Sequence, residues 1–292
     1  WKTGRLRSEY QTNAGGWICV LPVCKRRMAD KACTGRIFEN CAIKANFVFE
    51  VIMSMAKQKP VIIYENTVSG TFVRRLNRFT AEVLIDGQTE IVHIKNTGRL
   101  QELLVPKAKV TMQKTSNPNR KTEYDLISVY KPKLKWVNID SLAPNALIKQ
   151  ELMSRNYDLV KPEYNYGESR IDFYMERDGE KFLTEVKGCT LADDLNPGIG
   201  LFPDAPTERG VKHLYELAKA AKEGYHCEVA FVIQMNGIHL VLPNEKTQPE
   251  FKAALVNAAK MGVQIICYNC HVEANSVKIT RVVSDTARFV NM

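Results

Sequence analysis

The sequence predicts a two-domain protein in which a small β-barrel precedes an α/β domain with a mixed β-sheet. Three observations support this reading. Short strand-like runs separated by turn signals occupy residues 58–141. A hairpin pattern, followed by alternating helical and strand patterns, occupies residues 142–292. The length of 292 residues suits two domains of ordinary size, and no apolar run is long enough for a transmembrane helix.

The middle segment reads as a series of short β-strands. Strand-like runs occur at 72–85, 89–94, 109–113 and 124–130, and Asp86-Gly87 is a hairpin turn signal. So many strands in so short a segment fit a small barrel such as an OB-fold. This class of barrel exposes a groove that can bind a phosphate backbone and stack bases.

The positive charge of the chain is unevenly distributed. The net charge is +9, yet residues 142–292 hold seventeen Lys/Arg against twenty Asp/Glu, while residues 58–141 hold fourteen against eight. The middle segment therefore carries the basic footprint expected of a nucleic-acid binder. Each cation alone is better explained as a solvated surface charge, but as a set on one small domain they make phosphate contact competitive. The candidate phosphate contacts are Arg74, Arg75, Arg78, Arg99, Arg120 and Lys121.

The C-terminal segment begins with a helical pattern over 144–154, opened by Pro144. A hairpin follows around Asp178-Gly179. Helices are then expected at 207–222, with Thr207 as the N-cap, and at 249–261, and strands at 229–235 and 263–268. This order predicts an α/β core with a mixed sheet.

The hairpin concentrates charged residues that suit cation chemistry. Asp172 lies on the incoming strand and Glu185 and Lys187 on the outgoing one. Alternation places Asp172 opposite the apolar face formed by Ile171, Phe173 and Met175. Two carboxylates about 4 Å apart repel by roughly 4 kcal/mol at an effective dielectric of about 20. A Mg²⁺ or Mn²⁺ ion would turn that repulsion into binding, and a nearby lysine can stabilise developing negative charge. A solvated ladder of opposite charges is the rival reading.

The stretch after the hairpin carries a family resemblance. Residues 185–192, Glu-Val-Lys-Gly-Cys-Thr-Leu-Ala, lead into 202–214, Phe-Pro-Asp-Ala-Pro-Thr-Glu-Arg-Gly-Val-Lys-His-Leu. Together they resemble the signature of the sugar fermentation stimulation protein A (SfsA) family. Segments 79–83, 93–98 and 120–124 match the order and spacing of that family, so the resemblance covers roughly residues 60–280.

The resemblance implies an OB-fold followed by a restriction-endonuclease-like domain of the PD-(D/E)XK kind. It also implies DNA binding and, less securely, nuclease chemistry. Asp172 and Glu185 would bind the metal, Lys187 would act with them, and Arg209 and His213 would contact the scissile phosphate. Asp204 would cap the following helix or extend the metal site.

The turn Asn96-Thr97-Gly98-Arg99 is a further candidate site. Asn and Gly favour left-handed backbone, and the turn amides together with Arg99 can bind a phosphate. The family pattern makes this turn characteristic but usually has proline at the position of Lys95, so we expect a looser turn here.

The first predicted helix also departs from the family pattern. The pattern has a glutamate where this chain has Lys149 and Gln150. Glu151 lies about 100° further round the helix. Either Gln150 substitutes weakly for that carboxylate, or the helix contributes nothing to the site.

Residues 1–57 read unlike the rest. They contain Cys19, Cys24, Cys33 and Cys41 without a CxxC pair, so zinc binding is weakly supported. The resemblance begins only after Met53 and Met55. We therefore expect an N-terminal extension, disordered or mis-started, with initiation at one of those methionines. The rival is a basic arm that aids DNA binding.

The remaining cysteines are Cys189, Cys227, Cys267 and Cys270, and they include one CxxC pair. Reduced structural thiols explain a single pair better than a metal site does, and nothing indicates an oxidising compartment, so a cytoplasmic protein is expected.

Two functions compete at this point. One is a Mg²⁺-dependent DNA phosphodiesterase, and the other is a DNA-binding regulator of sugar metabolism that uses the nuclease-like domain as a scaffold. An RNA-binding protein with a processing role is a third, weaker reading. The sequence sets neither the strandedness of the DNA nor the oligomeric state.

Overall fold

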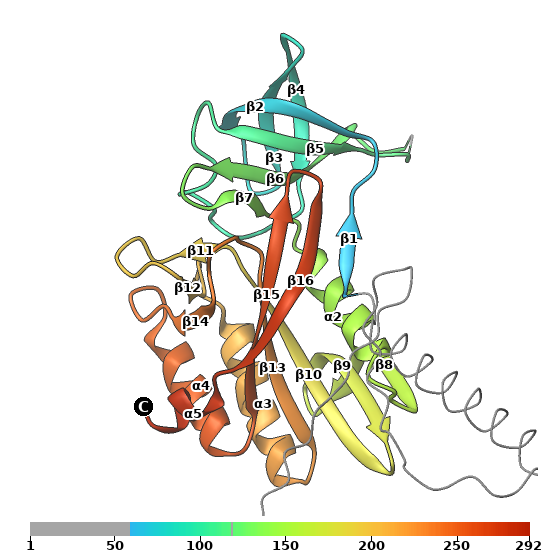
Figure 1. Cartoon of the computed structure of the whole chain (residues 1–292), viewed down its shortest axis with the longest axis vertical. Helices are drawn as coiled ribbons and strands as arrows, with labels where there is room; N and C mark the ends of the chain where they lie inside the picture. The colour runs from blue at the N-terminus through green and yellow to red at the C-terminus, as the bar shows by residue number, and fades with distance from the viewer. Residues whose placement is uncertain (1–58, 118) are drawn as a thin grey trace, which may run out of the picture. The chain divides into compact units, whose positions relative to one another are not determined.

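A computed structural model describes residues 59–117 and 119–292 (Figure 1). The chain divides into two units, Trp1–Lys57 and Gln58–Met292, and all described residues belong to the second. The expectations for the first 57 residues, including their four cysteines, lie outside the described residues. No helix in the described ranges is long and apolar enough to cross a membrane.

The first domain is a closed five-stranded barrel. Its strands are β2 (Thr67–Arg75), β3 (Thr80–Ile85), β4 (Gln88–Ile94), β5 (Lys109–Lys114) and β6 (Tyr124–Lys131). They pair in the order β4-β3-β2-β5-β6, and a parallel pairing of β4 with β6 closes the barrel. This confirms the predicted OB-fold.

The turns of the barrel follow from local chemistry. Asp86 and Gly87 have φ of 48° and 83°, the left-handed pair that a tight hairpin needs, as the sequence predicted. The expected run 72–85 instead forms two strands. The side chain of Asn77 accepts hydrogen bonds from the N–H groups of Phe79 (2.8 Å) and Thr80 (3.1 Å), and so ends the first strand in a turn.

The second domain is built on a seven-stranded mixed sheet, as expected for the nuclease-like α/β class. Its order is β1 (Val61–Ile63), β16 (Ser276–Ser284), β15 (Gln264–Glu273), β13 (His226–Ile233), β10 (Glu180–Cys189), β9 (Ser169–Arg177) and β8 (Leu159–Tyr166). Strands β10, β13 and β15 are parallel, and their neighbours are antiparallel. Strand β1, which the sequence grouped with the barrel, pairs with β16 in this sheet.

Helices cover both faces of the sheet. Along β13, Val229 and Phe231 join the core that contains α3 (Glu208–Lys222) and α4 (Pro249–Lys260). The alternate residues Ala230 and Val232 join the core that contains α2 (Ala143–Met153). A short helix α5 (Thr286–Val290) and a small sheet of β11 (Leu191–Ala192), β12 (Ile199–Phe202) and β14 (Leu240–Pro243) complete the domain.

The two domains are joined through β7 (Lys135–Asn138), which pairs with β6. Asn138 donates its backbone N–H to the carbonyl of Gln234 at 3.0 Å. The Gln234 amide returns bonds to Asn138 Oδ1 at 2.7 Å and to the Asp140 carbonyl at 3.0 Å. Because these groups are buried and mutually satisfied, they fix the barrel against the sheet at this point.

The cysteines of the second unit are structural. Cys189, Cys227, Cys267 and Cys270 are all buried and free. Cys267 packs in the core with α4 and Cys270 packs in the core with α2, so the CxxC pair points to opposite faces and cannot share a metal. Burial raises the pKa of Cys267 to about 11 and that of Cys270 to about 12.

Candidate functional site

The β9–β10 hairpin forms as predicted, with Asp178 and Gly179 at φ of 52° and 80°. The last paired residues of the two strands are Phe173 and Thr184. Beyond this pair, the backbone N–H of Val186 donates to Asp172 Oδ2 at 2.8 Å. The Asp172 carboxylate therefore lies in the fork where the two strands separate.

The apolar face of β9 differs from the expected alternation. Phe173 and Met175 pack in the core with α2, but Ile171 packs in the opposite core with the α3 residues. On β8, Glu163 has a left-handed φ of 54°, and it interrupts the pairing opposite Asp172. This irregularity interrupts the alternation of side chains along β9 at Asp172, whose carboxylate lies in the fork.

Glu185 and Lys187 lie on the face covered by α3. The Glu185 side chain is buried, and its Oε1 accepts from Lys187 Nζ and from His213 Nδ1, both at 2.5 Å. Its Oε2 is buried without a hydrogen-bond partner among the described residues. Burial alone would raise the pKa of Glu185, but the Lys187 ammonium and the His213 hydrogen bond together lower it.

Asp172 shows the opposite balance. Burial raises its pKa, and the negative charge of Glu185 raises it further. The carboxylates thus repel each other, and a buried oxygen of Glu185 has no partner. Both facts fit a hard divalent cation between them. No group of three or more His, Cys, Asp or Glu gathers as a metal site in the part of the chain that the structure describes. Water would therefore complete the shell of a cation held by Asp172 and Glu185, as is usual for Mg²⁺.

Helix α2 contributes to this site by a residue that the sequence analysis missed. Asn145 Nδ2 donates to Asp172 Oδ1 at 2.9 Å. Gln150, the expected substitute for the family glutamate, instead exchanges two hydrogen bonds with the backbone of Val61, at 3.0 and 3.1 Å, and so anchors β1. Asn145 follows Pro144 in the first turn of the helix, and only the packing of α2 shows that this turn faces the hairpin.

Helix α3 orients the site from the other side. Thr207 is its N-cap, as predicted, because its Oγ1 accepts from Gly210 N–H at 2.9 Å. His213 is buried, and its Nε2 accepts from Arg209 Nε at 3.3 Å while its Nδ1–H donates to Glu185. Both ring nitrogens are therefore engaged within the protein. Contrary to expectation, His213 has no nitrogen left for a phosphate and instead positions Glu185.

The outer face of α3 borders an open hollow of about 590 Å³. Arg209, Lys212 and Arg170 line it. Lys212 pairs with Glu168 at 3.2 Å and not with Glu208, the partner that the helical spacing indicated. Arg209 is exposed here and remains able to meet an anion with its other nitrogens.

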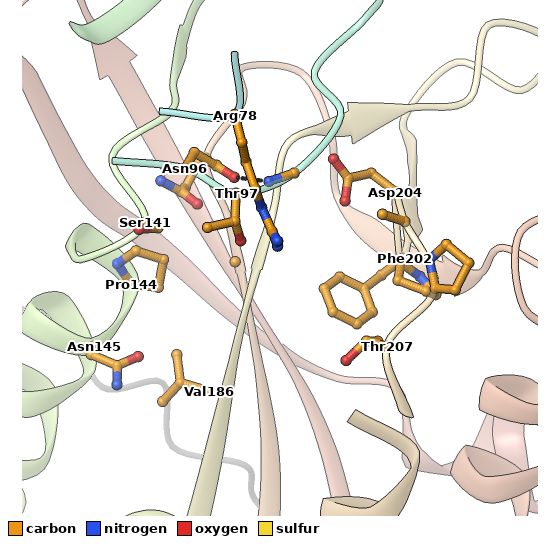
Figure 2. Close-up of a pocket in the computed structure, with 16 residues that line it drawn as sticks. Arg78, Asn96, Thr97, Ser141, Pro144, Asn145, Val186, Phe202, Asp204 and Thr207 are labelled. Carbon is orange, nitrogen blue, oxygen red and sulfur yellow. Dashed lines mark hydrogen bonds between the residues drawn. The ribbon is translucent and has the colours of Figure 1, made fainter. Parts of the chain in front are cut away.

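A pocket of about 320 Å³ lies between the barrel and the nuclease-like domain (Figure 2). The barrel lines it with Arg78, Thr97 and Gly98. The second domain lines it with Asn145 and Val186, the two residues that hold Asp172. The pocket therefore reaches from the barrel surface to the hydrogen-bond partners of Asp172, and the carboxylate itself does not line it.

The turn at 96–99 is fixed from both domains. Asn96 Oδ1 accepts from Gly98 N–H at 2.8 Å, which confirms the predicted turn. The N–H of Arg99 donates to Asp204 Oδ2 at 3.0 Å. Asp204 thus holds the turn and does not cap α3. A Cβ on Gly98 would lie 2.4 Å from the same oxygen, so a larger residue here would displace the Asp204 carboxylate from the turn.

Arg75 holds the same turn from inside the barrel. Its guanidinium donates to the carbonyls of five residues at 2.7 to 3.3 Å, namely Asn77, Arg78, Asn96, Gly98 and Arg99. All five of its N–H donors are used, so Arg75 has none left for a phosphate. Arg75 joins the 76–79 loop to the 96–99 turn. The sequence analysis, which grouped Arg75 with the phosphate-binding cations, did not predict this role.

Lys95 also stabilises the turn. Its Nζ lies 2.9 Å from Asp140 Oδ2, and its carbonyl accepts from Ser141 Oγ at 2.7 Å. The lysine that replaces the usual proline therefore anchors this strand end by a largely buried ion pair. The expected loosening of the turn is not seen.

The predicted phosphate-binding cations of the barrel fall into two groups. Arg74 forms a two-bond pair with Glu82 at 2.8 and 2.9 Å, and Arg120 forms one with Asp125 at 2.9 and 2.7 Å. Like Arg75, these two are committed to the fold. The exposed residues Arg78, Arg99 and Lys121 form no ion pair within residues 59–117 and 119–292.

Comparisons with known proteins agree along most of the described chain. Residues 140–276 match the family described as "Sugar fermentation stimulation protein RE domain", and residues 73–139 match "SfsA N-terminal OB domain". Two proteins named as sugar fermentation stimulation protein homologs are similar. The one from Ruminiclostridium cellulolyticum is 46% identical over 75% of this chain and 97% of its own length, and the one from Desulfitobacterium hafniense is 45% identical over 74% and 94%.

A solved structure is also similar. It is that of Pyrococcus furiosus SfsA in complex with Ca²⁺, which is 26% identical, has a TM-score of 0.68 and covers 77% of this chain and 98% of its own. The barrel, the nuclease-like sheet and these relatives all agree. The chain therefore belongs to the SfsA family of sugar fermentation stimulation proteins.

Proposed function

We propose that this protein binds DNA and hydrolyses its phosphodiester bonds in a reaction that depends on Mg²⁺ or Mn²⁺. The observation that carries the proposal is the unpartnered, buried Oε2 of Glu185 beside Asp172, whose pKa is raised. An oxygen left in this way costs free energy unless a ligand satisfies it. The Ca²⁺ complex of the Pyrococcus furiosus relative adds support for a cation in this family.

The protein groups have distinct roles in this proposal. Asp172 and Glu185 would hold the cation, which when bound polarises a phosphoryl oxygen and lowers the pKa of a water molecule. Lys187 lies beside Glu185 and supplies an ammonium that stabilises negative charge on the attacking oxygen or the phosphate. Asn145 and His213 keep the two carboxylates in place through their hydrogen bonds.

The barrel supplies the DNA contacts. Arg78, Arg99 and Lys121 are exposed and unpaired within the described ranges, and Arg78 and Thr97 line the pocket that leads to the partners of Asp172. Cations of this kind neutralise phosphates, so binding should weaken as salt rises. Replacing one of them should reduce the slope of log affinity against log salt concentration by about one, the contribution of one phosphate contact.

The test is cleavage of end-labelled single-stranded and duplex DNA with Mg²⁺ or Mn²⁺. Asp172→Asn, Glu185→Gln and Lys187→Ala should abolish cleavage. Glu245→Gln and Lys252→Ala are matched controls, because these residues form an exposed ion pair at 2.8 Å, and they should cleave like the wild type. Cleavage that persists in all three site variants would overturn the assignment.

The alternative is a DNA-binding regulator of sugar metabolism without catalysis. One observation favours it: α2 offers the amide of Asn145 where a third carboxylate would strengthen the metal site. Salt-sensitive DNA binding that the site variants leave unchanged, with no cleavage under either metal, would select this function over the nuclease.

A further inference from the structure

We propose that the DNA segment delivered to the site is single-stranded, and that Phe79 and Arg78 on the 76–79 loop of the barrel receive its bases and backbone. This inference rests on the proposed function, since it names the class of DNA on which the site acts. It draws on an exposed aromatic ring, an unpaired guanidinium and the continuity of two hollows.

Phe79 is an exposed aromatic residue whose backbone is held by hydrogen bonds. Its side chain is 51% exposed, in contrast to the buried Phe72 of the barrel core. Its backbone is held at both ends, because its N–H donates to Asn77 Oδ1 at 2.8 Å and its carbonyl accepts from Ile94 N–H at 2.7 Å. An exposed ring on a backbone that is held in this way can offer a face to a base.

Arg78 places a cation beside that ring. Its guanidinium carbon lies 6.0 Å from the centroid of Phe79, and it forms no ion pair within the described ranges. The loop that carries both residues is clamped, since Arg75 donates to the carbonyl of Arg78 at 2.8 Å. An aromatic face next to a cation is the combination with which proteins bind single strands, one for the base and the other for the phosphate.

The loop leads to the site through connected hollows. A second hollow, of about 550 Å³, lies on the barrel and is lined by Arg78, Thr97, Gly98 and Arg99 among others. The first three of these also line the 320 Å³ pocket that Asn145 borders. A DNA strand can therefore follow these two hollows from the loop, across the 96–99 turn, to the neighbourhood of Asp172.

The exposed ring favours a single strand over a duplex. Figure 2 shows Arg78 and Thr97 on one side of the pocket and Asp204 and Phe202 on the other. The hydrogen bond from Arg99 N–H to Asp204 ties these sides together. In a duplex the faces of the bases are covered by their neighbours and only the groove edges are open, so an exposed ring can stack only on a base that has left the duplex.

The test measures binding without metal, so that cleavage plays no part. The full chain in EDTA is titrated into a fluorescent oligonucleotide, as a single strand and as the matching duplex, and anisotropy reports affinity. We expect the single strand to bind at least tenfold more tightly. Phe79→Ala should weaken single-strand binding roughly tenfold, because base–aromatic stacking contributes on that scale, and leave duplex binding unchanged.

Tyr215→Ala is the matched control, because this ring is 50% exposed, like that of Phe79, but belongs to α3 and not to the barrel. It should bind both DNAs like the wild type. A 2-aminopurine base in the single strand should change fluorescence on binding to the wild type and to Tyr215→Ala, but not on binding to Phe79→Ala. Circular dichroism melting confirms that the variants are folded.

The outcomes separate this inference from the proposed function. Equal affinity for the two DNAs, or a Phe79→Ala variant that binds like the wild type, overturns the inference even if the protein cleaves duplex DNA in Mg²⁺. Single-strand binding that depends on Phe79, together with no cleavage under any metal, supports the inference and removes the nuclease.

Discussion

The barrel and the nuclease-like hairpin both bring charged side chains to the proposed site, but they hold them differently. In the hairpin, Asp172, Glu185 and Lys187 are largely buried, and their charges act on one another. In the barrel, three of the five candidate arginines, Arg74, Arg75 and Arg120, are hydrogen-bonded within the fold. The difference shows that a count of cations does not tell which side chains are used within the fold and which stay exposed.

The adjacent residues Arg74 and Arg75 give this comparison its sharpest test. Arg75→Ala removes five hydrogen bonds to carbonyls and should lower the free energy of unfolding by about 3 kcal/mol. Arg74→Ala removes an exposed pair and should cost about 0–1 kcal/mol. Urea denaturation measures both. Equal losses would mean that Arg75 does not clamp the two loops.

A pH series tests the buried charges of the barrel. Burial alone would raise the pKa of Asp125, but hydrogen bonds from Arg120 and His93 lower it below its usual 3.8. A lowered pKa means that this carboxylate stabilises the fold above about pH 3.8 and loses that effect as pH falls further. Asp125→Asn should therefore cost about 2 kcal/mol at pH 7, with the difference shrinking below pH 3.8.

Glu123→Gln is the control for that series, because Glu123 forms an exposed pair with Lys114. It should change stability little at any pH. A cost of Asp125→Asn that stays constant down to pH 3 would show that the charge of Asp125 is not what stabilises the barrel.

On the hairpin side, His213 should act through Glu185 and not through DNA. His213→Ala should raise the Mn²⁺ concentration needed for half-maximal single-turnover cleavage 10- to 100-fold, the usual effect of removing a group that orients a metal ligand. His213→Gln should recover part of this loss, because its amide can still donate to Glu185. DNA affinity measured in EDTA should not change. If that affinity falls instead, His213 contacts the phosphate as the sequence first indicated.

Local sequence patterns predicted the fold well where neighbours in the chain decide the outcome. The Asp-Gly turns, the Thr207 cap and the alternation along β10 are local rules, and the structure follows them. The closure of the barrel by a parallel pair and the place of β1 in the second sheet depend on distant pairing, which no local period encodes.

The same limit explains why sequence reasoning missed Asn145 and assigned Asp204 a different role. Asn145 and Asp204 gain their roles from partners 27 and 105 positions away. Arg75 and Arg78 are of the same type and lie three positions apart, yet one is fully hydrogen-bonded and the other forms no ion pair among the described residues. Only the backbone path of the 96–99 turn distinguishes them.

The central claim is that Asp172 and Glu185 form a divalent-cation site, and calorimetric titration with Ca²⁺ tests it without relying on activity. The wild type and the Glu245→Gln control should bind one Ca²⁺ per chain. Glu185→Gln and Asp172→Asn should lose that binding. Ca²⁺ should also raise the melting temperature of the wild type and of the Glu245→Gln control, but not of the two site variants, since a ligand that binds only the folded state stabilises it. Unchanged Ca²⁺ binding in both site variants, or no binding in the wild type, would contradict the account.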